Sequence, residues 1–194
     1  MNHSLEPSPA PQSGVLFDEM LVVLAQSGDT RAGARLYRRW APRLARAARR
    51  YSAGDDNAQD IAQECWLAIW KGLPRLRSPD KFRSYAFAVL HRRGADHLRR
   101  VIRDRETISD SAYEGLFERA DHHAASSSEM AMITQAFAGL PPDQRLAAHL
   151  HFVEGLTMTE IAEVQRIPEG TAKSRLFHAR RKLKAALDPS YEGE

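Results

Sequence analysis

The chain has 194 residues, 43% of them hydrophobic, and a formal net charge of +3 at pH 7, which is enough for one larger or two small globular domains. Cys65 is the single cysteine, so an intrachain disulfide is excluded and a thiolate metal site is not expected. Because no apolar run is as long as a membrane span and the N-terminus lacks a signal-peptide pattern, we expect a cytoplasmic protein without membrane insertion.

The N-terminal segment begins with a predicted tail. Residues 1–14 hold three prolines among small and polar residues, which is too little apolar content for an ordered structure. A first helix is expected over residues 15–26 and a second from about residue 29. Because Pro42 lies inside the second helix, we expect a kink or a break between Trp40 and Pro42.

The third predicted helix, residues 57–73, has a clear amphipathic pattern. At about 100° per residue, one wide arc of the helix is apolar and the opposite face is polar. The apolar arc holds Ile61, Ala62, Cys65, Trp66, Ile69, Trp70 and Leu73, and the polar face holds Asp60, Gln63, Glu64 and Lys71. Leu67 lies in the middle of the polar face. It is either an ordinary exposed residue or the apolar anchor of a partner site, and periodicity alone favours the ordinary interpretation.

A basic region follows. A proline-bearing loop over residues 74–80 precedes a fourth helix that starts near Lys81, with Gly94 as a candidate bend. Between residues 92 and 105 this region is rich in arginine, and three aromatic residues lie nearby, as expected for a surface that stacks or grips bases. For two of these aromatics, Phe82 and Tyr85, we favour a place in the core.

Residues 106–128 show no sustained apolar stripe. Their acids and serines predict a flexible linker that lets two domains move apart. Two further helices are expected, one over residues 129–139 and one over residues 144–154 with Asp143 as its cap. Since no strand pattern stands out, the predicted fold class is all-α, with two small helical domains joined by the linker.

Residues 156–184 predict a helix-turn-helix. Thr157 or Thr159 can cap its first helix, with Glu160 placed for a capping box. Pro168 closes that helix, and Gly170 with Thr171 is expected to provide the turn and the N-cap of the second.

The second helix of this pair has one apolar stripe and one basic face. The stripe consists of Ala172, Leu176, Ala179 and Leu183. Between Lys173 and Lys184 there are six lysines or arginines and no acid, which is typical of a recognition helix in the major groove. An amphipathic surface helix with a solvated charged face is the alternative, and the combination of break, cap and missing acids argues against it.

Four motifs occur in the order and spacing of a known family. They are Gly28-Asp29 with Leu36-Tyr37; DIAQE at 60–64 followed by Trp70; FRSY at 82–85 with DHLRR at 96–100; and EIAE with GTAKSRLFHAR at 160–180. With these motifs the chain resembles the extracytoplasmic-function (ECF) sigma factors, the small two-domain promoter-recognition subunits of bacterial RNA polymerase. The resemblance covers about residues 28–187.

The resemblance implies a domain organisation and three sets of site residues. The expected division is a tail (1–14), a sigma region 2-like domain (15–105), the linker (106–128), a region 4-like helix-turn-helix domain (129–188) and a second tail (189–194). Polymerase binding is assigned to Asp60, Gln63, Glu64 and Leu67. Binding of the downstream promoter element is assigned to Arg75, Arg77, Lys81, Arg83, His91, Arg92, Arg99 and Arg100. Binding of the upstream element is assigned to Thr171, Lys173, Ser174, Arg175, Phe177, His178 and Arg181.

The implied partners are core RNA polymerase, promoter DNA as a duplex and as a melted non-template strand, and an anti-sigma factor. No cofactor, metal or catalytic residue is expected, since Cys65 lies in an apolar arc and His122-His123 in the linker. A different class of function is a stand-alone helix-turn-helix regulator that binds duplex DNA as a dimer. The helix face from Asp60 to Leu67 distinguishes the two hypotheses, because only the sigma factor needs it for polymerase.

The chain departs from the family pattern at three places. Gln165-Arg166 stands where relatives usually carry Leu-Gly, and a left-handed cap without glycine is costly. His178 replaces a position that is often basic, which leaves a weaker or pH-dependent contact. His91-Arg92-Arg93 replaces a commoner arginine-asparagine-apolar series, so the sequence of the downstream element does not follow from the resemblance.

Overall fold

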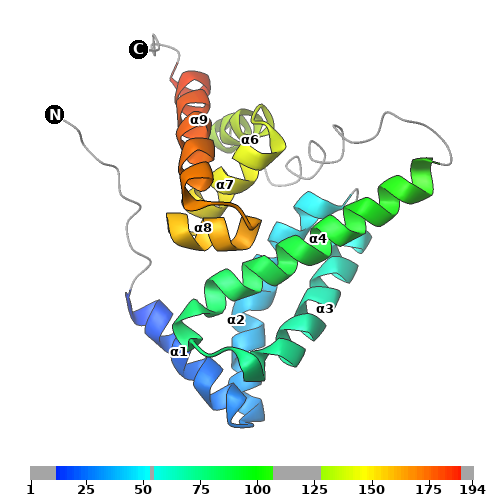
Figure 1. Cartoon of the computed structure of the whole chain (residues 1–194), viewed down its shortest axis with the longest axis vertical. Helices are drawn as coiled ribbons and strands as arrows, with labels where there is room; N and C mark the ends of the chain where they lie inside the picture. The colour runs from blue at the N-terminus through cyan, green and yellow to red at the C-terminus, as the bar shows by residue number, and fades with distance from the viewer. Residues whose placement is uncertain (1–11, 53–54, 107–127, 189–194) are drawn as a thin grey trace.

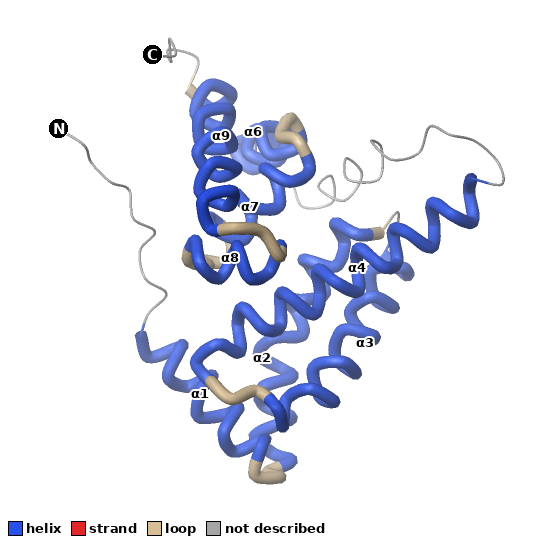
Figure 2. Tube along the Cα trace, viewed as in Figure 1, coloured by secondary structure: helices blue, strands red, loops and turns tan. Residues whose placement is uncertain are grey.

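The computed structural model describes residues 12–52, 55–106 and 128–188, and all regular structure in these ranges is helical (Figures 1 and 2). The predicted all-α fold class is therefore confirmed. The α-helices are α1 (Gln12–Gln26), α2 (Thr30–Ala48), α3 (Asp55–Gly72), α4 (Phe82–Glu106), α6 (Ser128–Ala138), α7 (Pro142–Phe152), α8 (Met158–Gln165) and α9 (Glu169–Leu187). Short 3-10 helices are η1 (Arg49–Tyr51), η2 (Leu73–Arg75) and η3 (Pro79–Lys81). The central part of the predicted linker, residues 107–127, lies outside the described residues.

Helix α2 begins at a clear cap and continues through its proline. The Asp29 carboxylate accepts hydrogen bonds from the backbone N–H groups of Arg31 (2.8 Å) and Ala32 (3.0 Å). The helix then runs past Pro42 to Ala48 without interruption, so of the two predicted possibilities, a kink or a break between Trp40 and Pro42, the break is wrong. Burial of the apolar face of α2 in the core offsets the hydrogen bond that the proline removes.

Helix α4 is also continuous where the sequence offered a bend. Gly94 lies in the middle of α4, and a Cβ atom there would lie 2.1 Å from Cγ of the Tyr51 ring. The glycine therefore serves a close approach between α4 and η1 rather than a bend.

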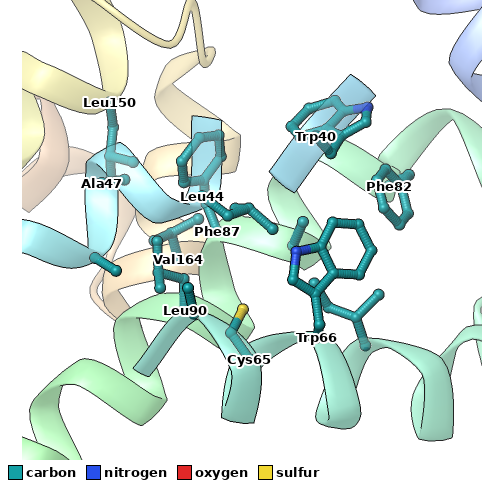
Figure 3. Close-up of a cluster of buried hydrophobic side chains, with 14 of the residues drawn as sticks. Trp40, Leu44, Ala47, Cys65, Trp66, Phe82, Phe87, Leu90, Leu150 and Val164 are labelled. Carbon is teal, nitrogen blue, oxygen red and sulfur yellow. The ribbon is translucent and has the colours of Figure 1, made fainter. Parts of the chain in front are cut away.

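The core joins the two halves of the described chain, residues 12–106 and 128–188. Figure 3 shows Trp40 and Leu44 of α2, Cys65 and Trp66 of α3, and Phe82 and Leu90 of α4 packed together, with Leu150 of α7 and Val164 of α8 beside them. Phe82 is fully buried and Tyr85 is half-buried, as the sequence favoured. A second cluster lies among α6, α7 and α9 and consists of Ala136, Leu140, Ala148, Leu176, Ala179 and Leu183.

The helix-turn-helix forms as predicted, but the N-cap of its second helix differs from the prediction. Thr157 and Glu160 make the expected capping box on α8: the backbone N–H of Thr157 donates to Glu160 Oε2 (2.8 Å), and the N–H of Glu160 to Thr157 Oγ1 (3.3 Å). Arg166 ends α8 in the left-handed conformation, with φ 55° and ψ 49°. Helix α9 begins at Glu169 with Pro168 at the N-cap, so the prediction of Thr171 as the cap is wrong.

The expected cap of α7 is also corrected. Pro141 occupies the N-cap and Asp143 lies in the first turn of the helix. The helix itself starts with Pro142, and proline is suited to this first position because its fixed φ is compatible with the helix and it has no N–H to satisfy.

Candidate polymerase- and DNA-binding surfaces

The four residues assigned to polymerase binding lie on α3, and three of them are exposed. Asp60 and Gln63 are exposed, and Leu67 exposes 71% of its surface although it is apolar. Glu64 is half-buried, with a carboxylate oxygen 3.5 Å from Nη2 of Arg100 on α4. The structure therefore brings these residues together around one protruding leucine, in the arrangement expected of a partner-binding face.

A groove of about 640 Å³ between α2 and α3 adjoins this face. Tyr37, Trp66 and Trp70 line it together with Gln63 and Leu67. The ring centroids of Tyr37 and Trp66 are 4.8 Å apart, and those of Trp66 and Trp70 are 5.5 Å apart. Sequence reasoning placed both tryptophans in the apolar arc and missed the groove, because the groove needs Tyr37 from another helix.

The residues assigned to downstream DNA are spread along η2, η3 and α4. Six of them are exposed: Arg75, Arg77, Lys81, Arg92, Arg99 and Arg100. The other two, Arg83 and His91, are half-buried. Nδ1 of His91 lies 3.0 Å from the hydroxyl of Tyr51, and burial lowers the pKa of His91 below its ordinary value. At neutral pH His91 is therefore an uncharged hydrogen-bonding group, not a cation.

Two of these basic side chains face the helix-turn-helix. Lys81 Nζ lies 3.3 Å from Oε1 of Glu163, and Arg83 Nη2 lies 3.1 Å from Oε2 of Glu160. Both carboxylates belong to α8. The structure therefore pairs part of the downstream set with the C-terminal half of the chain, which the sequence did not predict.

On the recognition helix α9, five of the seven assigned residues are exposed: Lys173, Ser174, Phe177, His178 and Arg181. Phe177 exposes 63% of its surface on this basic face, where an apolar ring is suited to contact with a thymine methyl group. The Lys173 ammonium lies 2.8 Å from Glu169 and lowers the pKa of that carboxyl.

The remaining two assigned residues of α9 are half-buried. Thr171 lies in the first turn of the helix. Arg175 donates to Oε1 of Gln165 (2.5 Å) and to Oδ2 of Asp143 (2.6 Å). In this arrangement Arg175 ties α9 to the end of α8 and the start of α7, so it stabilises the helix-turn-helix itself.

The described residues contain no group of three His, Cys, Asp or Glu side chains that could hold a metal ion. Cys65 is fully buried, and burial raises the pKa of its thiol to about 12, so the thiolate nucleophile is absent at neutral pH. His122 and His123 lie outside the described residues. Within the described ranges, none of the helices is long and apolar enough to cross a membrane.

Family models match both halves of the chain: Sigma-70 region 2 at residues 36–105 and Sigma-70, region 4 at residues 130–183. The RNA polymerase sigma-H factor of Pseudomonas aeruginosa is 30% identical over 184 residues, which cover 89% of this chain and 94% of that protein. The ECF RNA polymerase sigma factor SigC of Mycobacterium tuberculosis is 31% identical over 139 residues, or 72% of this chain and 75% of the relative.

Solved structures agree with these matches. CnrH in complex with the cytosolic domain of CnrY is similar with a TM-score of 0.62 and 26% identity, over 90% of this chain and 99% of that one. The Bartonella quintana sigma factor RpoE, solved with the anti-sigma factor NepR, shares the fold with a TM-score of 0.64 and 22% identity, over 81% of this chain and 98% of that one. With regions 2 and 4 in order along one chain and whole-length relatives of this kind, the chain belongs to the ECF sigma factors of bacterial RNA polymerase.

Proposed function

We propose that this sigma factor binds core RNA polymerase through α3, recognises promoter DNA with both halves of the chain, and promotes strand opening. It performs no chemistry itself, because the polymerase forms the phosphodiester bonds. The observation that carries the proposal is the exposed Leu67 on α3, one helical turn after the exposed Gln63 and on the same face as Asp60. An apolar side chain surrounded by polar neighbours is a typical anchor of a protein interface.

For DNA we propose two contacts. The exposed basic residues of η2, η3 and α4 bind the downstream element and the melted non-template strand, where positive charge follows the backbone and aromatic side chains can stack on bases. The basic face of α9 reads the upstream element in the major groove. The proposed division of labour is the one expected from the sequence, with residues 15–105 for the first task and 129–188 for the second.

We further propose that an anti-sigma factor controls the protein in the cytoplasm. Family membership supports this control, and so does the likeness to CnrH, which was solved in complex with the cytosolic domain of CnrY. The aromatic groove beside Leu67 would let one inhibitor cover the polymerase-binding face.

The polymerase face is tested with the double substitution Asp60→Ala and Leu67→Ala in the full chain. Loss of a central apolar anchor and its charged neighbour should weaken binding to core polymerase by about 10- to 100-fold. Titration of labelled sigma factor with core enzyme measures the affinity. Arg38→Ala, an exposed position of α2 whose guanidinium donates to its own helix at Ala34, is the control and should bind as the unmodified chain does. Unchanged affinity of the double variant would contradict the assignment.

A further inference from the structure

The outer face of α2 is strongly basic and has no part in the proposed function. From Thr30 to Tyr51 the chain holds eight arginines, no lysine and no acid. The same combination of many bases and no acid marked α9 as a DNA-binding helix. Helix α2 therefore carries a second cationic surface of comparable composition that still lacks a partner.

Four of these arginines form a row along the exposed side of α2, which packs against α1, α3 and α4 with its other sides (Figure 1). They are Arg31, Arg35, Arg38 and Arg46, and all four are exposed. At about 100° per residue they fall within an arc of about 80°, opposite the buried side chains of the helix. With a rise of about 1.5 Å per residue, the row extends over about 22 Å. We call these four residues the arginine row.

The charge of the arginine row is not neutralised within the part of the chain that the structure describes. No carboxylate there lies within ion-pair distance of any of the four guanidinium groups. Other arginines of α2 do have acidic partners: Arg39 pairs with Asp18, and Arg43 pairs with Glu154. The row is therefore a line of solvated charges that an anionic partner can reach.

The surroundings of the arginine row favour a nucleic-acid backbone over a protein as that partner. Protein interfaces are usually anchored by a central apolar or aromatic side chain, as Leu67 provides on α3. The exposed residues beside the row, such as Ala34 and Pro42, offer no such anchor. Tyr37 of α2 is exposed, but its ring packs against Trp66 with the centroids 4.8 Å apart. Guanidinium groups without an apolar anchor are suited to bidentate contacts with phosphate.

A straight row of cations on one helix suits duplex DNA better than a single strand. A duplex carries one negative charge per about 1.7 Å of its axis, which is twice the density of one strand. Surfaces for single strands combine positive charge with aromatic rings on which bases stack, and the arginine row contains no ring.

We propose that the arginine row binds the phosphate backbone of duplex DNA without reading its sequence. It is a third DNA contact of the protein, in addition to those on α4 and α9. The contact adds affinity that is independent of sequence and sensitive to salt, and it helps to hold the protein on the duplex beside the promoter elements. It goes beyond the proposed function, because neither the polymerase-binding face nor the two promoter-reading surfaces includes a residue of α2.

The first test replaces three residues of the row together in the full chain, Arg31→Gln, Arg35→Gln and Arg38→Gln. Fluorescence anisotropy measures the affinity for a labelled duplex of about 30 base pairs and for one of its strands, between about 50 and 200 mM salt. Loss of three phosphate contacts should lower the duplex affinity at least about tenfold at the lower salt concentration. It should also reduce the slope of log K against log salt by about 2–3.

Two controls separate phosphate contacts from net charge. The corresponding triple lysine variant keeps the three charges and should keep the salt slope, because lysine binds phosphate as a point charge. Arg39→Gln removes one charge from the same helix, but Arg39 is already paired with Asp18, so the slope should change much less than in Arg35→Gln. Equal effects of these two single variants would assign the loss to net charge and overturn the proposal.

The second test locates the DNA on α2 by photo-crosslinking. Ala34 is exposed beside the row, and Cys65 is buried, so a thiol-reactive photo-crosslinker attaches to Ala34→Cys and not to the native cysteine. Irradiation should link this position to the duplex, both in the full chain and in its complex with core polymerase. Glu129→Cys, an exposed position of α6, is the control and should link at least about fivefold less.

The possible outcomes also separate this inference from the proposed function. Unchanged duplex affinity in the triple glutamine variant, or a loss confined to the single strand, overturns the proposal. A crosslink from Ala34→Cys to a polymerase subunit in place of DNA overturns it too, in favour of an acidic protein partner. If the triple variant loses its helical circular dichroism, the crosslink alone decides. Run-off transcription with core polymerase on genomic fragments tests the proposed function independently, because promoter choice there depends on α4 and α9.

Discussion

Arg166 carries an unusual backbone conformation for its residue type. Among the described residues it is the only one other than glycine with a positive φ, and it ends α8 where the family usually has glycine. Its N–H still satisfies the helix end by donating to the carbonyl of Glu163 (3.3 Å). The resemblance drew attention to this position, because Gln165-Arg166 stands where relatives usually carry Leu-Gly, but it did not fix the conformation of the turn.

Replacing Arg166 with glycine should stabilise the protein. Glycine adopts a positive φ without the steric cost that a side chain adds, so we expect the free energy of unfolding to rise by about 0.5–1 kcal/mol. Thermal unfolding should show this as an increase of about 1–4 °C in Tm. Arg166→Ala is the control for the lost charge and should give no increase; equal gains in both variants would contradict a backbone cause.

The exposure of Leu67 could be predicted from the sequence, whereas the contacts of Arg175 could not. The exposure of Leu67 followed from helical periodicity, since its neighbours on α3 fixed the buried face. Arg175 was assigned to DNA because it belongs to the motif, yet its guanidinium contacts Asp143, 32 residues away. A partner so distant in sequence leaves no trace in local periodicity.

Helices α2 and α4 show that tertiary packing overrides local helix propensity. The rule that proline breaks a helix describes an isolated helix, whereas α2 is held by the buried side chains of Trp40 and Leu44 on either side of Pro42. Most helix positions along the chain followed from apolar periodicity. The starts of α7 and α9 differed from prediction because a proline took the N-cap in place of a polar side chain.

Gly94→Ala should strongly destabilise the protein. In an exposed helix this change is favourable, but here the added methyl group would overlap the Tyr51 ring at 2.1 Å. Because the ring is buried and cannot move away freely, we expect a loss of about 2–3 kcal/mol, measured by urea unfolding. Gly170→Ala, with no neighbouring atom within 4 Å, is the control and should be neutral or slightly stabilising.

For the whole molecule, the main difference from the sequence-based expectation is the packing between the halves. Amphipathic patterns predicted two helical groups separated by a linker, and the family matches follow the same order. The ion pairs between the halves, Arg43–Glu154, Lys81–Glu163 and Arg83–Glu160, could not be predicted, because each joins side chains 77 to 111 positions apart. Charge patterns within one helix do not show which distant helix will neutralise them.

The interface between the halves should weaken in mild acid. Burial, with help from Arg50 and Arg46 of α2, lowers the pKa of His149 to about 4 against the opposing effect of Glu154. Once the histidine is exposed, its pKa returns to about 6.5. Between pH 6.5 and 4 the exposed histidine therefore binds a proton that the buried one does not, and the folded protein loses stability as the pH falls.

Glu154 acts in the same direction at lower pH. Burial raises its pKa, but His149 and Arg43 lower it more, so the net pKa lies below the ordinary value and its contribution is lost as the pH falls through that pKa. We expect Tm to decrease from pH 7 to pH 5, with a loss of up to about 2 kcal/mol from His149. His149→Gln should flatten this dependence. If Tm of the His149→Gln variant falls equally steeply with pH, the pH dependence comes from other groups.

The burial of Cys65 in the core has a practical consequence for measuring the separation between the two halves of the chain. A thiol without solvent access reacts with maleimides only when the protein unfolds, so maleimide dyes do not label the native chain. Cysteines introduced on the exposed surfaces of α1 and α9 would accept a donor and an acceptor fluorophore, and energy transfer between them would follow the separation of the two halves in real time.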